Sequence, residues 1–223
     1  MPQGENNHDA QFYAGGIMRG DIASLSRAIT LAESSLPAHQ SLTRQIIAAC
    51  RSPQKPAFRL GVTGVPGVGK STFIETFGLH LHASGRRLAV LAVDPTSTRS
   101  GGSILGDKTR MQQLSALENV YIRPSPSAGS LGGITRVTYE AIVLCEAAGF
   151  DYVILETGGL GLSEIAVSRI TDFFLLLMLA GAGDELQGIK RGIMEMADAV
   201  VITKADSGNE KKAAAARAEF ARA

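Results

Sequence analysis

A glycine-rich stretch followed by a lysine and two hydroxyl residues carries the clearest chemical signal in the sequence. The run Gly64-Val65-Pro66-Gly67-Val68-Gly69-Lys70-Ser71 fits the pattern GxxxxGK[ST] at every fixed position. In such a loop the backbone N–H groups converge on phosphate oxygens, and the following helix points its positive dipole end at the same place. The lysine ammonium reaches the β- and γ-phosphates, and the serine hydroxyl is a ligand for Mg²⁺. The predicted phosphate-binding residues are Gly64, Val65, Pro66, Gly67, Val68, Gly69, Lys70, Ser71 and Thr72.

Three carboxylates lie where a metal-bound nucleotide could use them. Asp94 ends the run LAVLAVD and Glu156 ends DYVILE, so both are expected at the carboxyl ends of strands, where open α/β sheets bind ligands. Asp107 lies in the glycine-rich stretch GGSILGDKTR, whose glycines permit the movement that a γ-phosphate sensor needs. We predict a Mg²⁺ site at Ser71, Asp94, Asp107 and Glu156, and catalytic roles for Lys70, Asp107 and Glu156. A turn or helix-capping role is the alternative for these acids.

A second motif follows the apolar run AVVI near the end of the chain. Thr203-Lys204-Ala205-Asp206 places a carboxylate where it can accept hydrogen bonds from N1–H and the 2-amino group of guanine, which adenine does not offer. The stem of Lys204 can lie against the purine face. The pattern resembles the NKxD signature of GTPases, with Thr203 in place of an asparagine amide that would brace the loop and the base. We predict that Lys204 and Asp206 bind guanine.

These motifs need a fold that brings several strand ends together. From residue 56 onward, short apolar runs alternate with helical patterns, which is typical of parallel strands covered on both faces. We predict an α/β fold with a doubly wound, mainly parallel sheet of the P-loop NTPase type over residues 56–223, with a strand at 59–63 and a helix at 71–84. Residues 21–55 are expected to form an N-terminal helical hairpin, and residues 1–20 a flexible lead-in.

The composition limits the classes of partner. The 223 residues include 22 Lys+Arg and 21 Asp+Glu, so no overall field favours nucleic acid or an anionic membrane. The longest apolar run, residues 173–183, is about half of the ~20 residues that a membrane-spanning helix needs. Without a secretory signal pattern either, the expected location is cytoplasmic. Cys50 and Cys145 fit neither a metal site nor a disulfide framework, and we expect buried thiols.

Longer blocks of the sequence resemble one family. The segments GVTGVPGVGKST, AVDPTSTRSGGSILGDKTRM, IRPSPSAGSLGG, LCEAAGFDYVILET and AGAGDELQGIKRGIMEMAD are similar to those of the MeaB/ArgK/MMAA family of P-loop GTPases, over about residues 20–210. The resemblance implies a GTPase chaperone that docks on adenosylcobalamin-dependent methylmalonyl-CoA mutase, gates cofactor loading and protects the mutase. It also implies Mg²⁺ and GTP or GDP as ligands, a homodimer for the full-length family, and an additional switch that contains Asp184, Gln187 and Lys190.

Several features depart from the family pattern. Where the family reads ETVGVGQSE, this chain has Gly158 and Leu162 in place of valine and glutamine. Extra backbone freedom at Gly158 loosens this switch, and Leu162 cannot hydrogen-bond to water, so weaker hydrolysis or coupling is expected. Thr203 is the third departure. The chain also ends where the family continues into a C-terminal dimerisation arm, and we interpret it as C-terminally truncated, which leaves dimerisation open.

No glutamine or arginine can be assigned to orient an attacking water. We therefore expect slow unassisted turnover and a partner that completes the site. Arg99, Lys108 and Arg110 are candidate groups from this chain, with a solvated basic face as the alternative explanation for them. Rival functions are an ATPase or kinase associated with lysine/arginine/ornithine transport, a nucleotide-binding scaffold with little hydrolysis, and nickel insertion. Nickel insertion needs a cluster of metal ligands, whereas His80 and His82 are expected to point away from each other on a helix.

Overall fold

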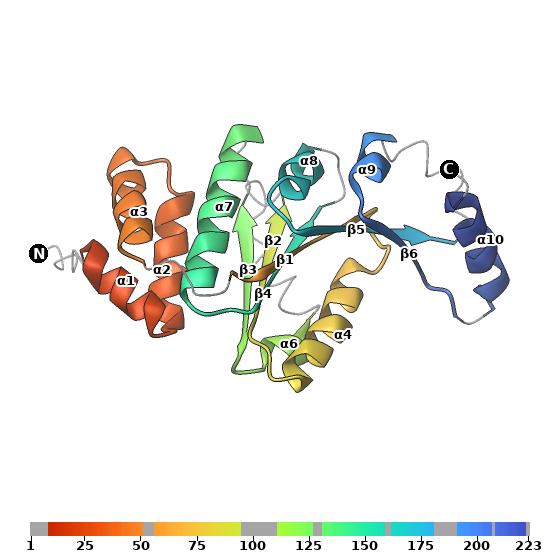
Figure 1. The fold of residues 1–223 in the computed structure, drawn as a ribbon, viewed down its shortest axis with the longest axis horizontal. Coiled ribbons are helices and arrows are strands. Elements are labelled where there is room, and N and C mark those ends of the chain that lie inside the picture. Colours follow the sequence, from red (N-terminus) through yellow and green to blue (C-terminus); the bar gives the residue numbers. More distant parts are fainter. Residues whose placement is uncertain are drawn as a thin grey trace, which may run out of the picture.

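Six parallel strands form one sheet, as the alternation of apolar runs predicts (Figure 1). The computed structural model describes residues 9–50, 56–94, 111–126, 131–158, 162–180, 191–206 and 208–221. Within those ranges the strands are β1 (Phe58–Gly64), β2 (Leu88–Asp94), β3 (Val120–Pro126), β4 (Tyr152–Thr157), β5 (Phe173–Leu179) and β6 (Ala199–Thr203). Their spatial order is β3-β2-β4-β1-β5-β6, and every neighbouring pair runs parallel.

Helices cover both faces of this sheet (Figure 1). On one face lie α4 (Lys70–Ala83) and α6 (Gln112–Ser115), and on the other lie α7 (Leu131–Ala147), α8 (Leu162–Ser168) and α9 (Arg191–Met196). The helix α10 (Glu210–Phe220) lies beside β6. The predicted doubly wound α/β fold is therefore confirmed. Among the helices of the described ranges, none is long and apolar enough to cross a membrane.

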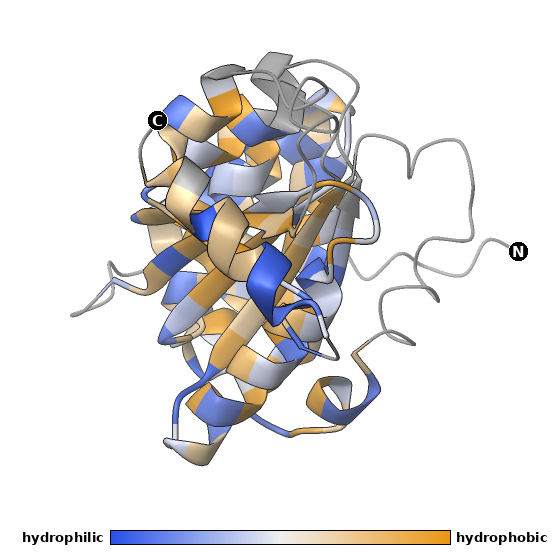
Figure 2. Cartoon of the chain, turned by 90° about the vertical axis from the view of Figure 1, so that its right-hand side faces the viewer, coloured by the Kyte–Doolittle hydropathy of each residue, from blue (hydrophilic) through white to orange (hydrophobic). Residues whose placement is uncertain are grey.

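The core is split by the sheet into two apolar layers, as strand alternation requires. In β2, Ala89, Leu91 and Val93 belong to the layer under α7 and α8, whereas Leu88 and Val90 belong to the layer under α4. Figure 2 shows the apolar strands in the interior and the polar segments mainly on the outer helices. Burial on both faces explains why the strands read as continuous apolar runs in the sequence.

The first helix corrects our prediction of a flexible lead-in over residues 1–20 for the part that the structure describes, while residues 1–8 lie outside the described residues. Ala10–Met18 form α1, and Asp9 caps its first turn by accepting a backbone hydrogen bond. Gly16 is buried, and a Cβ there would collide with the side chain of Ser24. The glycine lets α1 pack closely against the next helix. The same glycine obscures the helical pattern in the sequence, because it contributes neither helix propensity nor an apolar side chain.

Two further helices fulfil the predicted hairpin. They are α2 (Ile22–Glu33) and α3 (Pro37–Ala49). Asp21 caps α2 as expected and accepts the N–H of Ser24 at 3.0 Å, and Pro37 begins α3, where its missing N–H costs nothing. The N-terminal region is thus three helices rather than two, packed beside α7 and β3.

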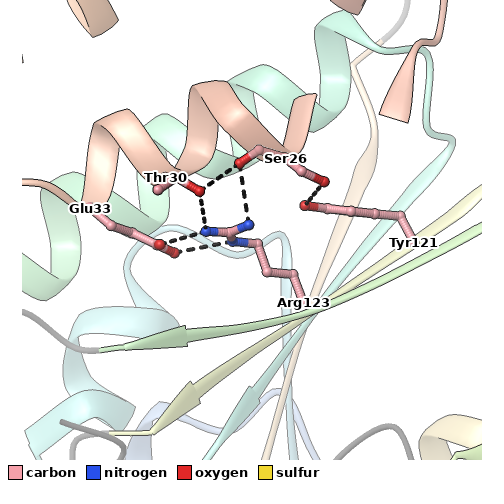
Figure 3. A network of polar contacts seen from close by, with 5 residues as sticks. All are labelled: Ser26, Thr30, Glu33, Tyr121 and Arg123. Atoms are coloured by element: carbon pink, nitrogen blue, oxygen red, sulfur yellow. Dashed lines mark hydrogen bonds and ion pairs between the residues drawn. The ribbon is translucent and has the colours of Figure 1, made fainter. Parts of the chain in front are cut away.

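A partly buried polar network attaches α2 to the edge strand β3 (Figure 3). Arg123 donates from Nε to Glu33 Oε1 at 3.2 Å and from Nη2 to Glu33 Oε2 at 2.6 Å, and its other bonds reach Thr30 Oγ1 and the Ser26 carbonyl. The Ser26 and Tyr121 hydroxyls are 3.2 Å apart. Burial by itself lowers the pKa of Arg123. The hydrogen bond with Glu33 and the negative charge of Glu33 outweigh burial, so the pKa of Arg123 is raised above its usual value. The guanidinium is therefore a permanent cation.

We predict that Glu33→Ala destabilises the fold by about 3 kcal/mol, because it leaves the Arg123 cation without its counter-ion. The two side chains are 12% and 17% exposed. The control is Glu140→Ala, which removes a helix-surface pair with Arg136, a residue that is 43% exposed, and should cost at most about 0.5 kcal/mol. Urea denaturation measures both. Equal losses in the two variants would contradict a special role for the buried pair.

Candidate functional site

The glycine loop joins β1 to α4 at the carboxyl edge of the sheet. Gly67 and Gly69 have φ angles of 79° and 105°, a region that side chains other than glycine rarely adopt. Gly64 is required for space as well, since a Cβ there would lie 2.5 Å from the Leu177 carbonyl oxygen of β5. The strand extends one residue beyond the predicted bounds at each end, and the helix begins and ends one residue earlier than predicted, so that Lys70 is the first helical residue.

A cavity of about 450 Å³ opens above this loop, at the carboxyl ends of β1, β2 and β4. It lies at the N-terminus of α4, where backbone N–H groups and the helix dipole favour an anion. Its lining comes from the loop, the start of α4 and the ends of β2 and β4, namely Pro66, Gly67, Gly69, Lys70, Ser71, Thr72, Ala92, Val93, Glu156, Thr157 and Gly158. Six of the nine predicted phosphate-binding residues thus line the same cavity as Glu156, whereas Gly64, Val65 and Val68 are not part of its lining.

The charged side chains of the site are held by short contacts. Lys70 is 9% exposed, and its Nζ donates to the Gly64 carbonyl at 2.8 Å and to the Val65 carbonyl at 3.3 Å. Ser71 Oγ donates to Glu156 Oε1 at 3.0 Å. A hydroxyl and a carboxylate at this separation are oxygen donors of the kind that Mg²⁺ takes. The side chains present therefore fit the predicted metal.

Other predicted residues cannot be placed as side chains. The backbone of Asp94 ends β2 at the same edge of the sheet, and in the register of the sheet it follows the pair Val93↔Thr157. Outside the described residues lie Asp107, Asp184, Gln187, Lys190, Arg99, Lys108 and Arg110.

The predicted base-recognition motif contacts the glycine loop through Thr203, a residue that we expect from the sequence to weaken the motif. Thr203 Oγ1 lies 2.7 Å from the Val68 carbonyl and 3.1 Å from the Met178 carbonyl. The threonine hydroxyl thus braces the loop, a role that we had assigned to the missing asparagine amide. The backbone of Lys204 has a φ of 51°. Lys204 and Asp206 are both exposed, and neither belongs to the lining of the cavity.

Sequence reasoning did not find this brace. A threonine at the end of an apolar strand reads as an ordinary strand residue, because its β-branched side chain suits a sheet. The hydrogen bond joins positions that are 135 residues apart, so no local sequence pattern indicates it.

The cysteines take no part in the site. Burial raises the pKa of the fully buried Cys145 thiol to about 12, and partial burial raises that of Cys50. Both thiols stay protonated at neutral pH and are poor nucleophiles. Cys145 is buried as predicted, whereas Cys50 is half-buried.

A glycine loop between a parallel strand and a helix, with a lysine, a serine and a strand-end carboxylate around it, defines a P-loop nucleotide-binding protein. Comparison with known proteins narrows the class. The family model described as "Methylmalonyl Co-A mutase-associated GTPase MeaB" matches residues 25–223, and the chain belongs to this family of GTPases.

Individual relatives agree with the family model. A probable GTPase of Mycobacterium tuberculosis is 55% identical over 210 residues, which are 94% of this chain and 62% of the relative. GTPase ArgK of Escherichia coli is 52% identical over 90% of this chain and 61% of its own length. A crystal structure titled LAO/AO transport system kinase superposes with a TM-score of 0.78 at 39% identity, covering 98% of this chain and 64% of that one. The chain thus spans less than two thirds of these relatives.

We predict that Thr203→Val weakens the binding of guanosine diphosphate about fivefold, because the loop loses the hydrogen bond that the Thr203 hydroxyl donates, worth about 1 kcal/mol. Thr203→Ser keeps the hydroxyl and should bind within twofold of the parent chain. Titration with a fluorescent diphosphate measures both. If valine and serine bind alike, the hydroxyl does not brace the loop in solution.

Proposed function

We propose that this protein binds and hydrolyses GTP in the cavity above the glycine loop. The observation that carries the proposal is the pairing of Ser71 with Glu156 at 3.0 Å, beside the ammonium of Lys70. It places a hydroxyl, a carboxylate and a cation at one helix N-terminus. These are the groups that phosphoryl transfer needs, since the protein mainly positions the phosphates and stabilises their charge.

Lys70 changes partners when the nucleotide binds. Its ammonium now donates to two loop carbonyls, and phosphate oxygens replace these neutral acceptors with charged ones. Such bonds are about twice as strong as neutral ones. The loop N–H groups and Thr72 hold the remaining phosphate oxygens, and the N–H of Gly158 lies at the cavity, where the γ-phosphate is expected.

Ser71 and Glu156 would hold Mg²⁺, together with the predicted acids Asp94 and Asp107. The ion, when bound, supplies positive charge to the β- and γ-phosphates. The chain's own contribution is to keep the two oxygen groups facing each other from α4 and β4.

Guanine is recognised by Lys204 and Asp206 on the loop that follows β6. Both side chains are exposed, so they are accessible to a base whose phosphates occupy the cavity. Thr203, the first residue of this motif, contacts the phosphate loop directly. The two halves of the nucleotide site are therefore physically joined.

The family description supports a client for this activity. We propose that the protein acts with methylmalonyl-CoA mutase as a chaperone that controls adenosylcobalamin loading, and that Asp184, Gln187 and Lys190 carry the nucleotide state to the mutase. A transport-associated kinase and a scaffold without hydrolysis are the rivals that the following experiments separate.

Base selectivity is the first expected result. The chain should prefer GDP to ADP by a hundredfold or more, about 2.7 kcal/mol, in competition titrations with Mg²⁺. Asp206→Ala should abolish the preference, because the carboxylate that accepts from guanine is gone. Glu118→Ala is the control, since this exposed carboxylate lies at the opposite, amino-terminal end of β3. Equal binding of ADP by the parent chain would favour the rival functions.

Partner-dependent turnover is the second expected result. Hydrolysis by the chain alone should be slow, and mutase should accelerate it, by up to ~10³–10⁵ if the mutase supplies an arginine. Phosphate release with and without mutase measures this. Fast hydrolysis that is independent of mutase would contradict a site completed by the partner.

A further inference from the structure

Two buried threonines form a hydroxyl pair directly beneath the nucleotide site. Thr63 in β1 and Thr157 in β4 are each 1% exposed, and Thr157 Oγ1 donates to Thr63 Oγ1 at 2.9 Å. The two residues follow the register pair Val62↔Glu156. They therefore join the two strands at the point where each turns into a loop of the site.

The pair lies on the face of the sheet away from α4. Alternation places Val62 in the layer under α4 and Leu155 in the opposite layer, so Glu156 faces α4, where it meets Ser71, while Thr63 and Thr157 face the other way. Thr157 also lines the cavity, but its hydroxyl donates to Thr63 rather than to Lys70, Ser71 or Glu156. The bond between the threonines therefore acts on the site through the two strand ends that it joins.

Each threonine is the immediate neighbour of a functional group. Thr63 precedes Gly64, whose carbonyl accepts from Lys70. Thr157 lies between the Glu156 carboxylate and Gly158 at the cavity. A change in the separation of the two strand ends would therefore move the partner of Lys70 relative to the partner of Ser71.

Packing alone does not explain two hydroxyls at these positions. The other β4 residues of this layer, Val153 and Leu155, are apolar, and valine would fill nearly the same space as threonine. A buried hydroxyl costs free energy unless it is hydrogen-bonded. The pair is therefore favourable only as a pair, and it cross-links two strand ends that must each hold a loop.

We infer that Thr63 and Thr157 are positioning residues that hold the Glu156 and Gly158 segment in register with the phosphate loop. The inference rests on the proposed GTPase function and deepens it. The hydroxyl bond sets the distance between the two loops, and so the geometry in which Lys70 and Glu156 meet the γ-phosphate.

The test uses variants that separate positioning from stability. Thr157→Val removes the cross-link and leaves the Thr63 hydroxyl unsatisfied, so it should lower both the stability of the fold and the kcat of GTP hydrolysis, the latter about tenfold. Thr157→Ser should restore kcat to within threefold. In the double variant Thr63→Val with Thr157→Val no hydroxyl is left unsatisfied, so stability should recover while kcat stays low.

A matched control and a second measurement complete the test. Thr43→Val also removes a fully buried hydroxyl, one that donates to the His39 carbonyl in α3 at 2.9 Å, and should leave kcat unchanged. Hydrogen exchange at the amides of Gly64 and Gly158 should be faster in both Thr157→Val variants and unchanged in Thr43→Val.

The outcomes distinguish a failure of the positioning role from a failure of the proposed GTPase function. A double variant that regains kcat together with stability, or unchanged exchange at both glycines, overturns the positioning role. A parent chain that neither binds nor hydrolyses GTP overturns the proposed function. Hydrogen exchange at Gly64 and Gly158 needs no nucleotide, so it still tests whether the threonine pair holds the two strand ends.

Discussion

The parallel register of β2, β4 and β1 is the constraint on which the site depends. Glu156 is paired with Ala92 on one side and with Val62 on the other. This register ends all three strands at one edge of the sheet, so the glycine loop, the Glu156 carboxylate and the end of β2 meet there without long side chains to bridge them. A slip of one residue would turn Glu156 to the opposite face, away from Ser71.

Polar bonds between distant segments maintain this edge of the sheet. Thr203 attaches the end of β6, and with it the predicted base-recognition motif, to the glycine loop, and Thr157 attaches β4 to β1. Backbone ladders alone fix strands along their length but not the loops beyond their ends. Buried hydroxyl bonds supply that missing constraint, and they are directional, which apolar packing is not.

The N-terminal helices act on the same sheet from its far edge. Arg123 and Glu33 join α2 to β3, and β3 pairs with β2 as far as Asp94. A strand at the edge of a sheet has a neighbour on one side, so the ion pair gives β3 a second support. The helices before residue 50 therefore belong physically to the nucleotide-binding unit.

The sequence by itself determined the chemistry and the class of fold. Gly64 to Ser71 encode their loop locally, because glycine conformation and the lysine and serine side chains act within eight residues, and two-sided burial marks the strands as apolar runs. The tertiary structure decided what depends on contacts between distant residues. The helix α1 packs against α2 with Gly16 at Ser24, where a larger residue would not fit, although the pattern of α1 in the sequence is weak. The brace at Thr203 and the pair at Thr63 and Thr157 join residues about a hundred positions apart, and a threonine in a strand looks the same in sequence whether its hydroxyl is a structural cross-link or not.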